Sequence, residues 1–428
     1  MRTIRVGLLG CGHVGSAVAR MLHAGAEDLE RRTGCRIEVT AVAVRNPALE
    51  RDVPVSIERI TGDARAVASD PDVDVVVELI GGIEPARSLI LRALSAGKHV
   101  VTANKELLSS LGRELFDASE AAGVDLFFEG AVGGGIPLVR PLKESLAGER
   151  LARVLGIVNG TTNYVLTRMT EDGMAFEEAL AQAERLGYAE RDPTDDIEGF
   201  DAAAKCAILA SIAFNSRVVA GEVYREGISG VTVEDIVFAR RLGYVVKLLA
   251  IAELEDGDVS ARVHPAMIPA DHPLAAVRET FNAVFVEGPT VGQLMFYGRG
   301  AGGGPTATAV VGDLAQVARN VASGGRGVGC TCYRDRPLRP MQDMESQYYL
   351  LLDVVDRPGV LAQVADAFGR NLVSIKEVWQ EGTGEEALLV LITHRANEGA
   401  VQATASDLRA LDVVAEVRSV MRVEGGEG

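Results

Sequence analysis

The most constraining feature of the sequence is a glycine-rich loop near its start. Residues 4–9 form an apolar run typical of a buried strand, and an apolar-periodic helix is expected to continue to about Leu29. Between them lie Gly10, Gly12 and Gly15, whose spacing permits a tight turn, close approach of a pyrophosphate and close helix–strand packing. Free N–H groups at the start of the helix favour phosphate binding. The loop predicts a dinucleotide-binding domain; the alternative is a glycine-rich turn without a ligand.

The rest of the first third repeats this alternation of strands and helices. Further apolar runs typical of strands occupy residues 36–44, 74–80, 99–102 and 124–128, and a helix is expected near 85–96. Nearly continuous apolar strands that alternate with helices indicate a parallel sheet covered on both faces. Residues 1–137 are therefore predicted to form a Rossmann-type, doubly wound α/β domain, with a helix over 306–322 packing back onto it.

Two further units follow the first. Residues 138–330 are predicted to form an α+β domain for catalysis and dimerisation. Its expected helices are 175–186 and 201–213, and its expected strands are 151–158, 260–268 and 281–287. Residues 331–346 are expected to be a linker, because they contain the Pro337–Pro340 segment.

The last unit, residues 347–428, has the order β-α-β-β-α-β of a small ferredoxin-like domain. Its expected strands are 347–355, 372–380, 386–394 and 412–423, and its expected helices are 359–369 and 397–410.

Composition excludes several classes of protein. The formal net charge of -17 and the pI of about 4.9 argue against nucleic-acid and anionic-membrane partners. The sequence has no apolar run long enough for a membrane span and no signal-peptide pattern. Its five cysteines are odd in number and include no Cys-x-x-Cys pair, so a disulfide framework or a zinc site is not expected. These features together predict a cytoplasmic protein.

The end of the second predicted strand bears on the choice of cofactor. The sequence there is Val44-Arg45-Asn46-Pro47, without the acidic residue that would hold a ribose 2′-hydroxyl group. An arginine at this place suits a 2′-phosphate, which favours NADP over NAD. The alternative is that Arg45 stacks on the adenine.

A lysine follows the strand at 99–102. Ligands of open α/β sheets bind beyond the carboxyl ends of the strands, which is where Thr102 and Lys105 are expected to lie. Lys105 would thus lie near the nicotinamide and could polarise a substrate oxygen. The alternative is an ordinary solvated lysine.

The densest signal is an acidic segment over residues 187–205. Asp201 and Lys205 are four residues apart on a predicted helix and face the same way. A carboxylate there can orient an ammonium group, and a lysine can move the proton that an aldehyde–alcohol interconversion needs. Glu190 could receive a cationic amino group. The plain alternative is an ion pair on a solvated helix face.

The segment resembles the signature of homoserine dehydrogenases. The matching residues are Ala183-x-x-x-Gly187-Tyr188-Ala189 and Asp192-Pro193-x-x-Asp196-Ile197-x-Gly199-x-Asp201-x-x-x-Lys205. The resemblance extends over nearly the whole chain. It includes the loop of Gly10–Gly15 and the segments 102–105, 129–137, 159–164 and 300–307.

The resemblance implies a role for each matched residue. Lys205 matches the proton donor, with Asp201 and Lys105 also in the catalytic set. The implied substrate-binding residues are Glu190, which would hold the amino group of homoserine, and Asp195, Asp196 and Thr161. The implied cofactor-binding residues are Gly10, Gly12, His13, Val14, Gly15, Arg45, Thr102, Lys105 and Gly303. A structural monovalent cation, Na⁺ in this family, is implied at Glu129, Val132, Gly134 and Ile136; a plain glycine-rich bend is the alternative.

The C-terminal unit resembles an ACT domain. Its Asp356-Arg357-Pro358-Gly359 matches the turn between the first strand and the first helix of such domains. ACT domains pair through their strands and bind an amino acid, which in this family is threonine. The alternative is a purely structural, subunit-pairing role.

The expected reaction is the reversible, NAD(P)H-dependent reduction of L-aspartate 4-semialdehyde to L-homoserine, in the biosynthesis of threonine, methionine and isoleucine. The expected partners are the small-molecule substrate, threonine as an inhibitor, and a second copy of the chain in a homodimer or larger homo-oligomer. One rival is another Rossmann-type amino-acid dehydrogenase. Another is a non-catalytic sensor of nucleotide and threonine, which would have no reason to keep Lys105, Glu190, Asp201 and Lys205 together.

Overall fold

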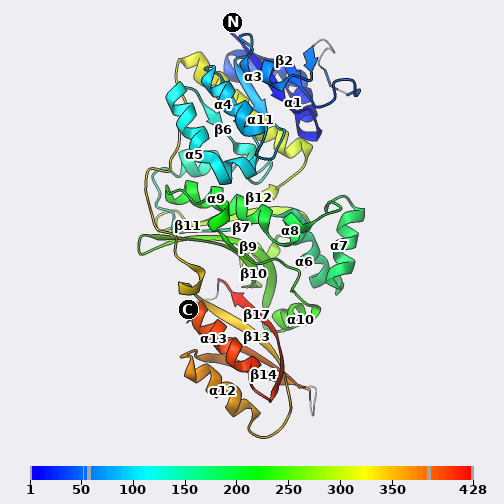
Figure 1. Cartoon of the computed structure of the whole chain (residues 1–428), viewed down its shortest axis with the longest axis vertical. Coiled ribbons are helices and arrows are strands. Elements are labelled where there is room, and N and C mark those ends of the chain that lie inside the picture. The colour runs from blue at the N-terminus through cyan, green and yellow to red at the C-terminus, as the bar shows by residue number, and fades with distance from the viewer. Residues whose placement is uncertain (1, 52, 55–58, 383–386, 426–428) are drawn as a thin grey trace.

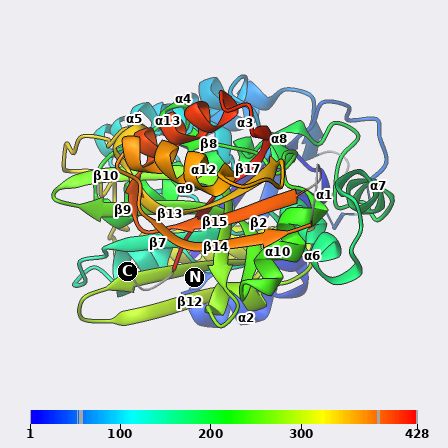
Figure 2. The same ribbon diagram turned by 90° about the horizontal axis from the view of Figure 1, so that it is seen from below.

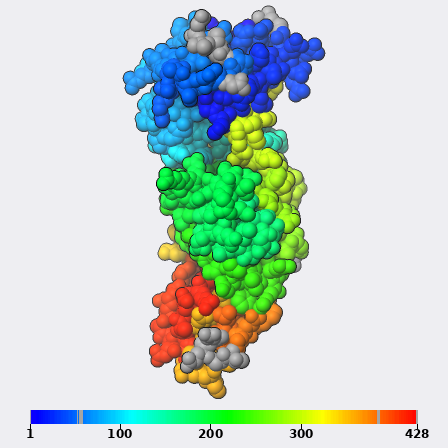
Figure 3. Space-filling view, turned by 90° about the vertical axis from the view of Figure 1, so that its right-hand side faces the viewer, coloured from blue at the N-terminus to red at the C-terminus, as the bar shows by residue number. Residues whose placement is uncertain are grey.

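The computed structural model describes residues 2–51, 53–54, 59–382 and 387–425, so position 386, where one predicted strand begins, lies outside the described residues. Three parts are stacked along the long axis of the molecule (Figure 1). In the space-filling view of Figure 3, the segment near residue 310 lies against the N-terminal residues, although the chain between them crosses the middle of the molecule. Among the described residues, no helix has the length and apolar character to cross a membrane.

The first part is built on a six-stranded parallel sheet in the order β3-β2-β1-β4-β5-β6. Its strands are β1 (Arg2–Leu9), β2 (Cys35–Ala43), β3 (Ile60–Thr61), β4 (Val75–Glu78), β5 (His99–Thr102) and β6 (Leu126–Phe127). Its helices are α1 (His13–Ala24), α2 (Ala26–Thr33), α3 (Ala64–Ser69), α4 (Ala86–Ser95), α5 (Lys105–Ala122) and α11 (Gly303–Ser323). The prediction of a doubly wound, parallel α/β fold is confirmed.

In the first part, side chains that alternate along a strand pack into two separate cores on the two faces of the sheet. Val75 and Val77 of β4 pack with α1 and α11, whereas Val76 packs with α3, α4 and α5. This two-sided burial explains why the strands are nearly continuous apolar runs. The prediction of one helix continuing to Leu29 is wrong, because the chain turns at Gly25, which ends α1 and begins α2.

The middle part contains an antiparallel sheet in the order β12-β11-β7-β9-β10. Its strands are β7 (Arg153–Ile157), β8 (Tyr224–Arg225), β9 (Tyr244–Glu255), β10 (Asp258–Pro269), β11 (Phe281–Gly288) and β12 (Gly292–Arg299). Its helices are α6 (Gly160–Asp172), α7 (Phe176–Arg185), α8 (Thr194–Ile197), α9 (Phe200–Phe214) and α10 (Val233–Arg241). Helix α9 is buried along most of its length and packs on β9 and β10, which holds Asp201 and Lys205 on a rigid support.

The C-terminal part has the strand order β17-β13-β15-β14 of a ferredoxin-like unit. Its elements are β13 (Glu345–Val354), α12 (Val360–Arg370), β14 (Ile375–Glu381), β15 (Ala387–Thr393), β16 (Ala396–Asn397), α13 (Glu398–Arg409) and β17 (Val414–Val423). Helices α12 and α13 lie together on one side of this sheet (Figure 2). The opposite face, with Tyr349 and Leu351, packs on the middle part.

The middle and C-terminal sheets are continuous. Strand β10 pairs in parallel with β17, with Ala266 opposite Arg422, so the two sheets form one sheet of 11 strands. Buried charges lie at this junction: the Arg262 guanidinium contacts Glu253 at 2.6 Å and Glu424 at 3.1 Å. Removing one partner of such a buried pair leaves an uncompensated charge, which costs about 3–5 kcal/mol. The C-terminal part is therefore joined firmly to the middle part.

Candidate active site

A cavity of about 690 Å³ lies between the first and middle parts. The first part contributes the segments that follow β1, β4 and β5, including Val14, Ile80 and Lys105. Strands β1 and β4 are neighbours on which the strand order reverses, and open α/β sheets bind their ligands at this point. The middle part supplies the opposite wall, including Asp201 and Lys205.

The glycines of the first loop have the geometry that a phosphate-binding turn needs. Gly10 has a φ of +101°, and a Cβ on Gly15 would lie 2.3 Å from the carbonyl oxygen of Gly10. A Cβ on Gly12 would meet nothing within 4 Å, so the space above this residue is open. Gly12 is the N-cap of α1, whose first N–H groups lie beside that open space.

Of the predicted cofactor residues, Val14 and Lys105 line the cavity, and the other seven lie outside its lining: Gly10, Gly12, His13, Gly15, Arg45, Thr102 and Gly303. Arg45 is exposed directly after β2, and among the residues the structure describes its guanidinium has no partner. Thr102 is fully buried, and its hydroxyl donates to Glu78 at 2.7 Å. Sequence reasoning missed Glu78, which also accepts the N–H groups of Ile80 and Gly81 and so shapes the loop at the cavity. Its only signal in the sequence was a carboxylate ending an apolar strand.

Two lysines from different parts of the molecule flank one buried carboxylate. The Lys205 ammonium donates to Asp201 at 2.7 Å and to the Val158 carbonyl at 2.7 Å. Lys105, the first residue of α5, lies 3.3 Å from the other oxygen of Asp201. The structure thus brings the three predicted catalytic residues together, although residues 105 and 201 are far apart in the sequence.

Electrostatics stabilise this cluster in its charged form. Burial by itself would raise the pKa of Asp201, but the charges of Lys205 and Lys105 outweigh it and lower that pKa. Burial would likewise lower the pKa of Lys105, but the Asp201 carboxylate outweighs it and raises that pKa. The carboxylate is therefore ionised, and the Lys105 amine is protonated, throughout the neutral pH range.

Asn159 connects this cluster to the acidic segment. Its side-chain amide donates to Asp196 at 2.7 Å and to Asp201 at 2.9 Å, while its oxygen caps α6. The Thr161 hydroxyl lies 2.9 Å from Asp196. Asn159 lies in a matched segment of the sequence but was not predicted as a site residue. An asparagine before a helix is typical of an N-cap, and its contacts with Asp196 and Asp201 depend on the tertiary fold.

The remaining acidic residues are more exposed. Glu190 lines the cavity, and no described residue is bonded to its carboxylate. Asp195 is exposed and does not line this cavity; it faces an adjoining one, which shares Lys105, Glu190 and Asp196 with the first. The structure therefore brings Asp196 and Glu190 to the lysine pair and leaves Asp195 to one side.

The glycine-rich bend after β6 packs under the cavity. The Glu129 carboxylate accepts N–H groups from Leu138, Val139 and Arg140 at 2.5–2.9 Å. Burial and the nearby Glu129 carboxylate raise the pKa of Asp313 to about 8. In this described bend, no hydrogen bond reaches the carbonyl groups of the other three predicted cation ligands, which are Val132, Gly134 and Ile136.

The segment at the start of α11 packs against the first glycine-rich loop and against the bend after β6. A Cβ on Gly303 would lie 3.0 Å from the carbonyl oxygen of His13, and a Cβ on Gly134 would lie 2.5 Å from that of Gly300. Three glycine-rich segments therefore meet beside the cavity. A parallel sheet with a phosphate-binding turn at its switch point, facing paired lysines, defines a nicotinamide-dependent dehydrogenase.

Comparison with known proteins agrees with this class. Residues 10–129 match the family model "Homoserine dehydrogenase, NAD binding domain", and residues 137–315 match the model "Homoserine dehydrogenase". The chain is 51% identical over 435 residues to a homoserine dehydrogenase of Mycobacterium tuberculosis, covering 99% of this chain and 98% of that protein. It is 48% identical over 426 residues to the enzyme of Corynebacterium glutamicum, covering 98% and 96%.

Solved structures show the same likeness. A homoserine dehydrogenase from Thiobacillus denitrificans has 43% identity and a TM-score of 0.94, with 99% of both chains covered. A hyperthermophilic archaeal homoserine dehydrogenase in complex with NADPH has 25% identity and a TM-score of 0.63, covering 74% of this chain and 97% of that one. The chain belongs to the homoserine dehydrogenase family and is an oxidoreductase with an NAD-binding domain.

The open space at Gly12 gives a test of the cofactor site. A Gly12→Ala methyl group meets nothing in the free protein but fills the space that a pyrophosphate needs. We expect NADPH to bind at least about tenfold more weakly, a loss of about 1.4 kcal/mol, with a nearly unchanged unfolding temperature. Fluorescence titration and thermal unfolding measure the two quantities. Gly148→Ala, whose Cβ also meets nothing, is the control; equal NADPH affinity in both variants would contradict this cofactor position.

Proposed function

We propose that the protein catalyses the reversible NAD(P)H-dependent reduction of L-aspartate 4-semialdehyde to L-homoserine. The observation that carries this proposal is Asp201 between Lys205 and Lys105, in a cavity at the switch point of the first sheet. The bound cofactor supplies the hydride. The residues of the chain then have to hold the substrate and provide a proton for the oxygen on C4.

Lys205 is the group we assign to proton transfer. Its ammonium has three N–H bonds, and the Asp201 carboxylate and the Val158 carbonyl accept two of them. One N–H remains for a substrate oxygen in the cavity that Lys205 lines. In the reduction this proton passes to the C4 oxygen as the hydride arrives, and in the reverse direction Lys205 takes it back. Lys105 holds the same oxygen from the other side.

The acidic segment suits the amino end of the substrate. Glu190 is exposed in the cavity wall and no described residue is bonded to its carboxylate, so an incoming ammonium group would supply a partner. Asp196 and Thr161 lie beside it and are already fixed by hydrogen bonds. Asp195 faces the adjoining cavity, so it contributes to substrate binding only through the negative charge that it adds to the acidic segment.

Replacing Lys205 tests the proton-transfer proposal. We expect Lys205→Ala to lower kcat by at least about 10², the lower range of what a positioned acid–base group contributes. NADPH binding should hardly change. Stopped-flow or steady-state absorbance at the NADPH band with aspartate semialdehyde measures the rate, and Lys376→Ala on β14 is the remote control. Near-normal turnover of Lys205→Ala would show that Lys105 or water, and not Lys205, transfers the proton.

We also propose NADP as the preferred cofactor and a monovalent cation, Na⁺, at the bend of residues 129–136. Arg45 supports the first, because its exposed guanidinium, which has no partner among the described residues, lies at the end of β2 and can receive a 2′-phosphate. The unused carbonyl groups of Val132, Gly134 and Ile136 support the second. The Glu129 carboxylate is already bonded to three N–H groups, so a cation there would rely on carbonyl oxygens.

Arg45→Ala separates the two ways in which this arginine could act. Loss of a charge-assisted hydrogen bond costs about 1.5–3 kcal/mol, so NADPH should bind roughly tenfold or more weakly while NADH is little affected. Dissociation constants for both cofactors give the comparison. Arg36→Ala, at the other end of β2, is the control. Equal losses for NADPH and NADH would show that Arg45 only stacks on the adenine.

We further propose that the three parts divide as a cofactor domain over 1–137, a catalytic domain over 138–330, a linker over 331–346 and an ACT domain over 347–428. The strand order β17-β13-β15-β14 supports the last assignment. The turn at 356–359 joins β13 to α12, and residues 371–375 connect α12 to β14. Threonine would bind between these two segments.

A homodimer is the proposed assembly. The exposed edge of β14 presents Val378 and Trp379, with 45% and 48% of their surfaces exposed. Unpaired edge strands offer N–H and C=O groups to a second chain.

All five cysteines are free thiols, which supports a reducing cytoplasm as the location.

A contact between the C-terminal and middle parts offers a route for inhibition by threonine. Arg422 of β17 contacts Glu226 at 2.8 Å. Two residues further on, the N–H of Ile228 donates to the carbonyl of Ile197, the last residue of α8 within the acidic segment. A shift of β17 would therefore be transmitted to the loop that we assign to the substrate.

Glu226→Gln tests this route. We expect millimolar threonine to slow the native enzyme, and the variant to be inhibited at least about fivefold more weakly, since typical couplings are about 1–3 kcal/mol. Initial rates against threonine concentration measure the effect, with Asp366→Asn on α12 as the control. Unchanged inhibition that is competitive with homoserine would place threonine in the active site. Absence of inhibition in both proteins would leave subunit pairing as the role of the C-terminal part.

A further inference from the structure

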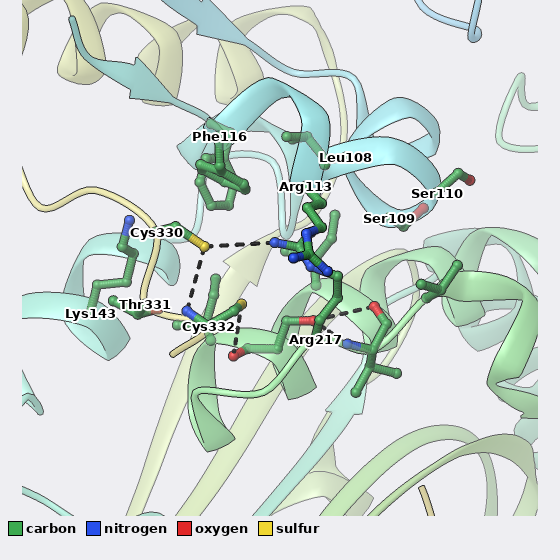
Figure 4. Close-up of a pocket in the computed structure, with 17 residues that line it drawn as sticks. Leu108, Ser109, Ser110, Arg113, Phe116, Lys143, Arg217, Cys330, Thr331 and Cys332 are labelled. Atoms are coloured by element: carbon green, nitrogen blue, oxygen red, sulfur yellow. Dashed lines mark hydrogen bonds between the residues drawn. The ribbon is translucent and has the colours of Figure 1, made fainter. Parts of the chain in front are cut away.

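A second cavity contains a pair of cysteines that the dehydrogenase chemistry does not use. It lies between α5, α9 and the segment at 328–332, away from the cavity that holds Lys205. Apolar Phe116 and Phe128 form one side of it. Figure 4 shows the residues of this cavity, which is lined by two thiols, Cys330 and Cys332, and by three cationic side chains, Arg113, Lys143 and Arg217.

The two cysteines contact each other through the backbone N–H of Cys332. The sulfur of Cys330 accepts the backbone N–H of Cys332 at 3.5 Å and a guanidinium N–H of Arg217 at 3.8 Å. The thiol of Cys332 donates to the carbonyl oxygen of Ser211 at 3.7 Å. Among the described residues, both hydrogen-bond partners of the Cys330 sulfur are thus donors.

The backbone between the cysteines permits a bond between their sulfurs. Two residues of extended chain span at most about 7 Å, and disulfides join Cα atoms that are about 4.4–6.8 Å apart. Side chains two residues apart on an extended segment point to the same side, and the N–H of Cys332 already donates to the Cys330 sulfur at 3.5 Å. The Lys143 ammonium donates to the carbonyls of Val328 and Gly329 at 3.0 and 2.8 Å and holds the segment in place.

The surroundings make one of the two sulfurs a nucleophile. Hydrogen bonding from Cys332, together with the charges of Arg217 and Lys143, lowers the pKa of Cys330 to about 6 against the effect of burial. The neighbouring Cys330 sulfur, together with burial, raises the pKa of Cys332. By contrast, burial raises the pKa of Cys206 to about 12. A thiolate beside a thiol is the usual arrangement of a reactive and a resolving cysteine.

We propose that Cys330 and Cys332 form a thiol-oxidation site whose substrate is a peroxide and whose product is a Cys330–Cys332 disulfide. The Cys330 thiolate attacks one peroxide oxygen, the O–O bond breaks, and the other oxygen leaves with a proton as water or alcohol. The sulfenic acid formed on Cys330 is then attacked by the sulfur of Cys332. The S–S bond forms, the S–O bond breaks, and water leaves with the thiol proton, so that the peroxide is reduced by two electrons.

This site is not a metal centre. Among the described residues no group of three or more His, Cys, Asp or Glu side chains could hold a metal ion, and two thiols alone leave a soft metal without its usual ligands. The cationic neighbours would also repel a metal ion while they stabilise a thiolate. The test of this proposal does not depend on dehydrogenase activity, because mass spectrometry detects the oxidised cysteines directly.

The experiment uses the full-length protein treated with stoichiometric hydrogen peroxide and digested with trypsin after alkylation. Arg326 and Arg334 flank both cysteines, so residues 327–334 form one tryptic peptide. We expect this peptide to become lighter by two hydrogen atoms and resistant to alkylation, and to be restored by dithiothreitol. In Cys332→Ser, a dimedone adduct should collect on Cys330; in Cys330→Ser, neither product should form.

The pH dependence of alkylation distinguishes a thiolate site from two merely neighbouring cysteines. The rate of Cys330 alkylation should level off above about pH 7. The rate for an ordinary thiol, with a pKa of about 8.5, continues to rise above that pH. Arg217→Met should shift the Cys330 profile to higher pH. The buried Cys35 and Cys206 serve as internal controls. Peroxide that yields no internal disulfide, a dimedone adduct on Cys332 instead of Cys330, or an alkylation profile of Cys330 centred near pH 8.5 would each overturn the proposal.

Discussion

The carboxylate of Asp201 is the contact on which the active-site cavity depends. It binds Lys205 on its own helix, Lys105 at the start of α5 and Asn159 at the start of α6. Lys105 belongs to the first part of the molecule, so this ionic contact also joins the first part to the middle part. Burial of a carboxylate is costly unless charged partners compensate it, and here two ammonium groups do so. Without Asp201, the two lysines would repel each other across the cavity.

The C-terminal part is joined to the same framework by a different physical means. Its last strand extends the sheet of the middle part, and arginines at that junction are buried among carboxylates. A continuous sheet resists independent movement more than a flexible linker does. A ligand that moved the C-terminal part would therefore displace β17 and its contact with Glu226, rather than swing a loosely tethered domain.

Much of the fold could be predicted from local patterns. The apolar runs of β1, β2 and β4 and the glycines between β1 and α1 are visible in the sequence because burial on both faces of a parallel sheet permits few polar residues. The β-α-β-β-α-β order of the last part was also readable. The break at Gly25 was missed, since a glycine inside a helical pattern can either be tolerated within the helix or mark its end. The continuity of β10 with β17 was missed because strand pairing between distant segments leaves no local signal.

For the site, local sequence patterns were enough to predict which residue types are present and where the helix carrying Asp201 and Lys205 lies, because spacing along a helix fixes which side chains share a face. Tertiary structure alone decided that Lys105 meets Asp201, that Asn159 links Asp201 to Asp196, and that Asp195 faces another cavity. It alone also placed Arg217 and Lys143 around Cys330 and Cys332. These contacts join elements far apart in the chain, and their geometry is set by how helices and sheets pack.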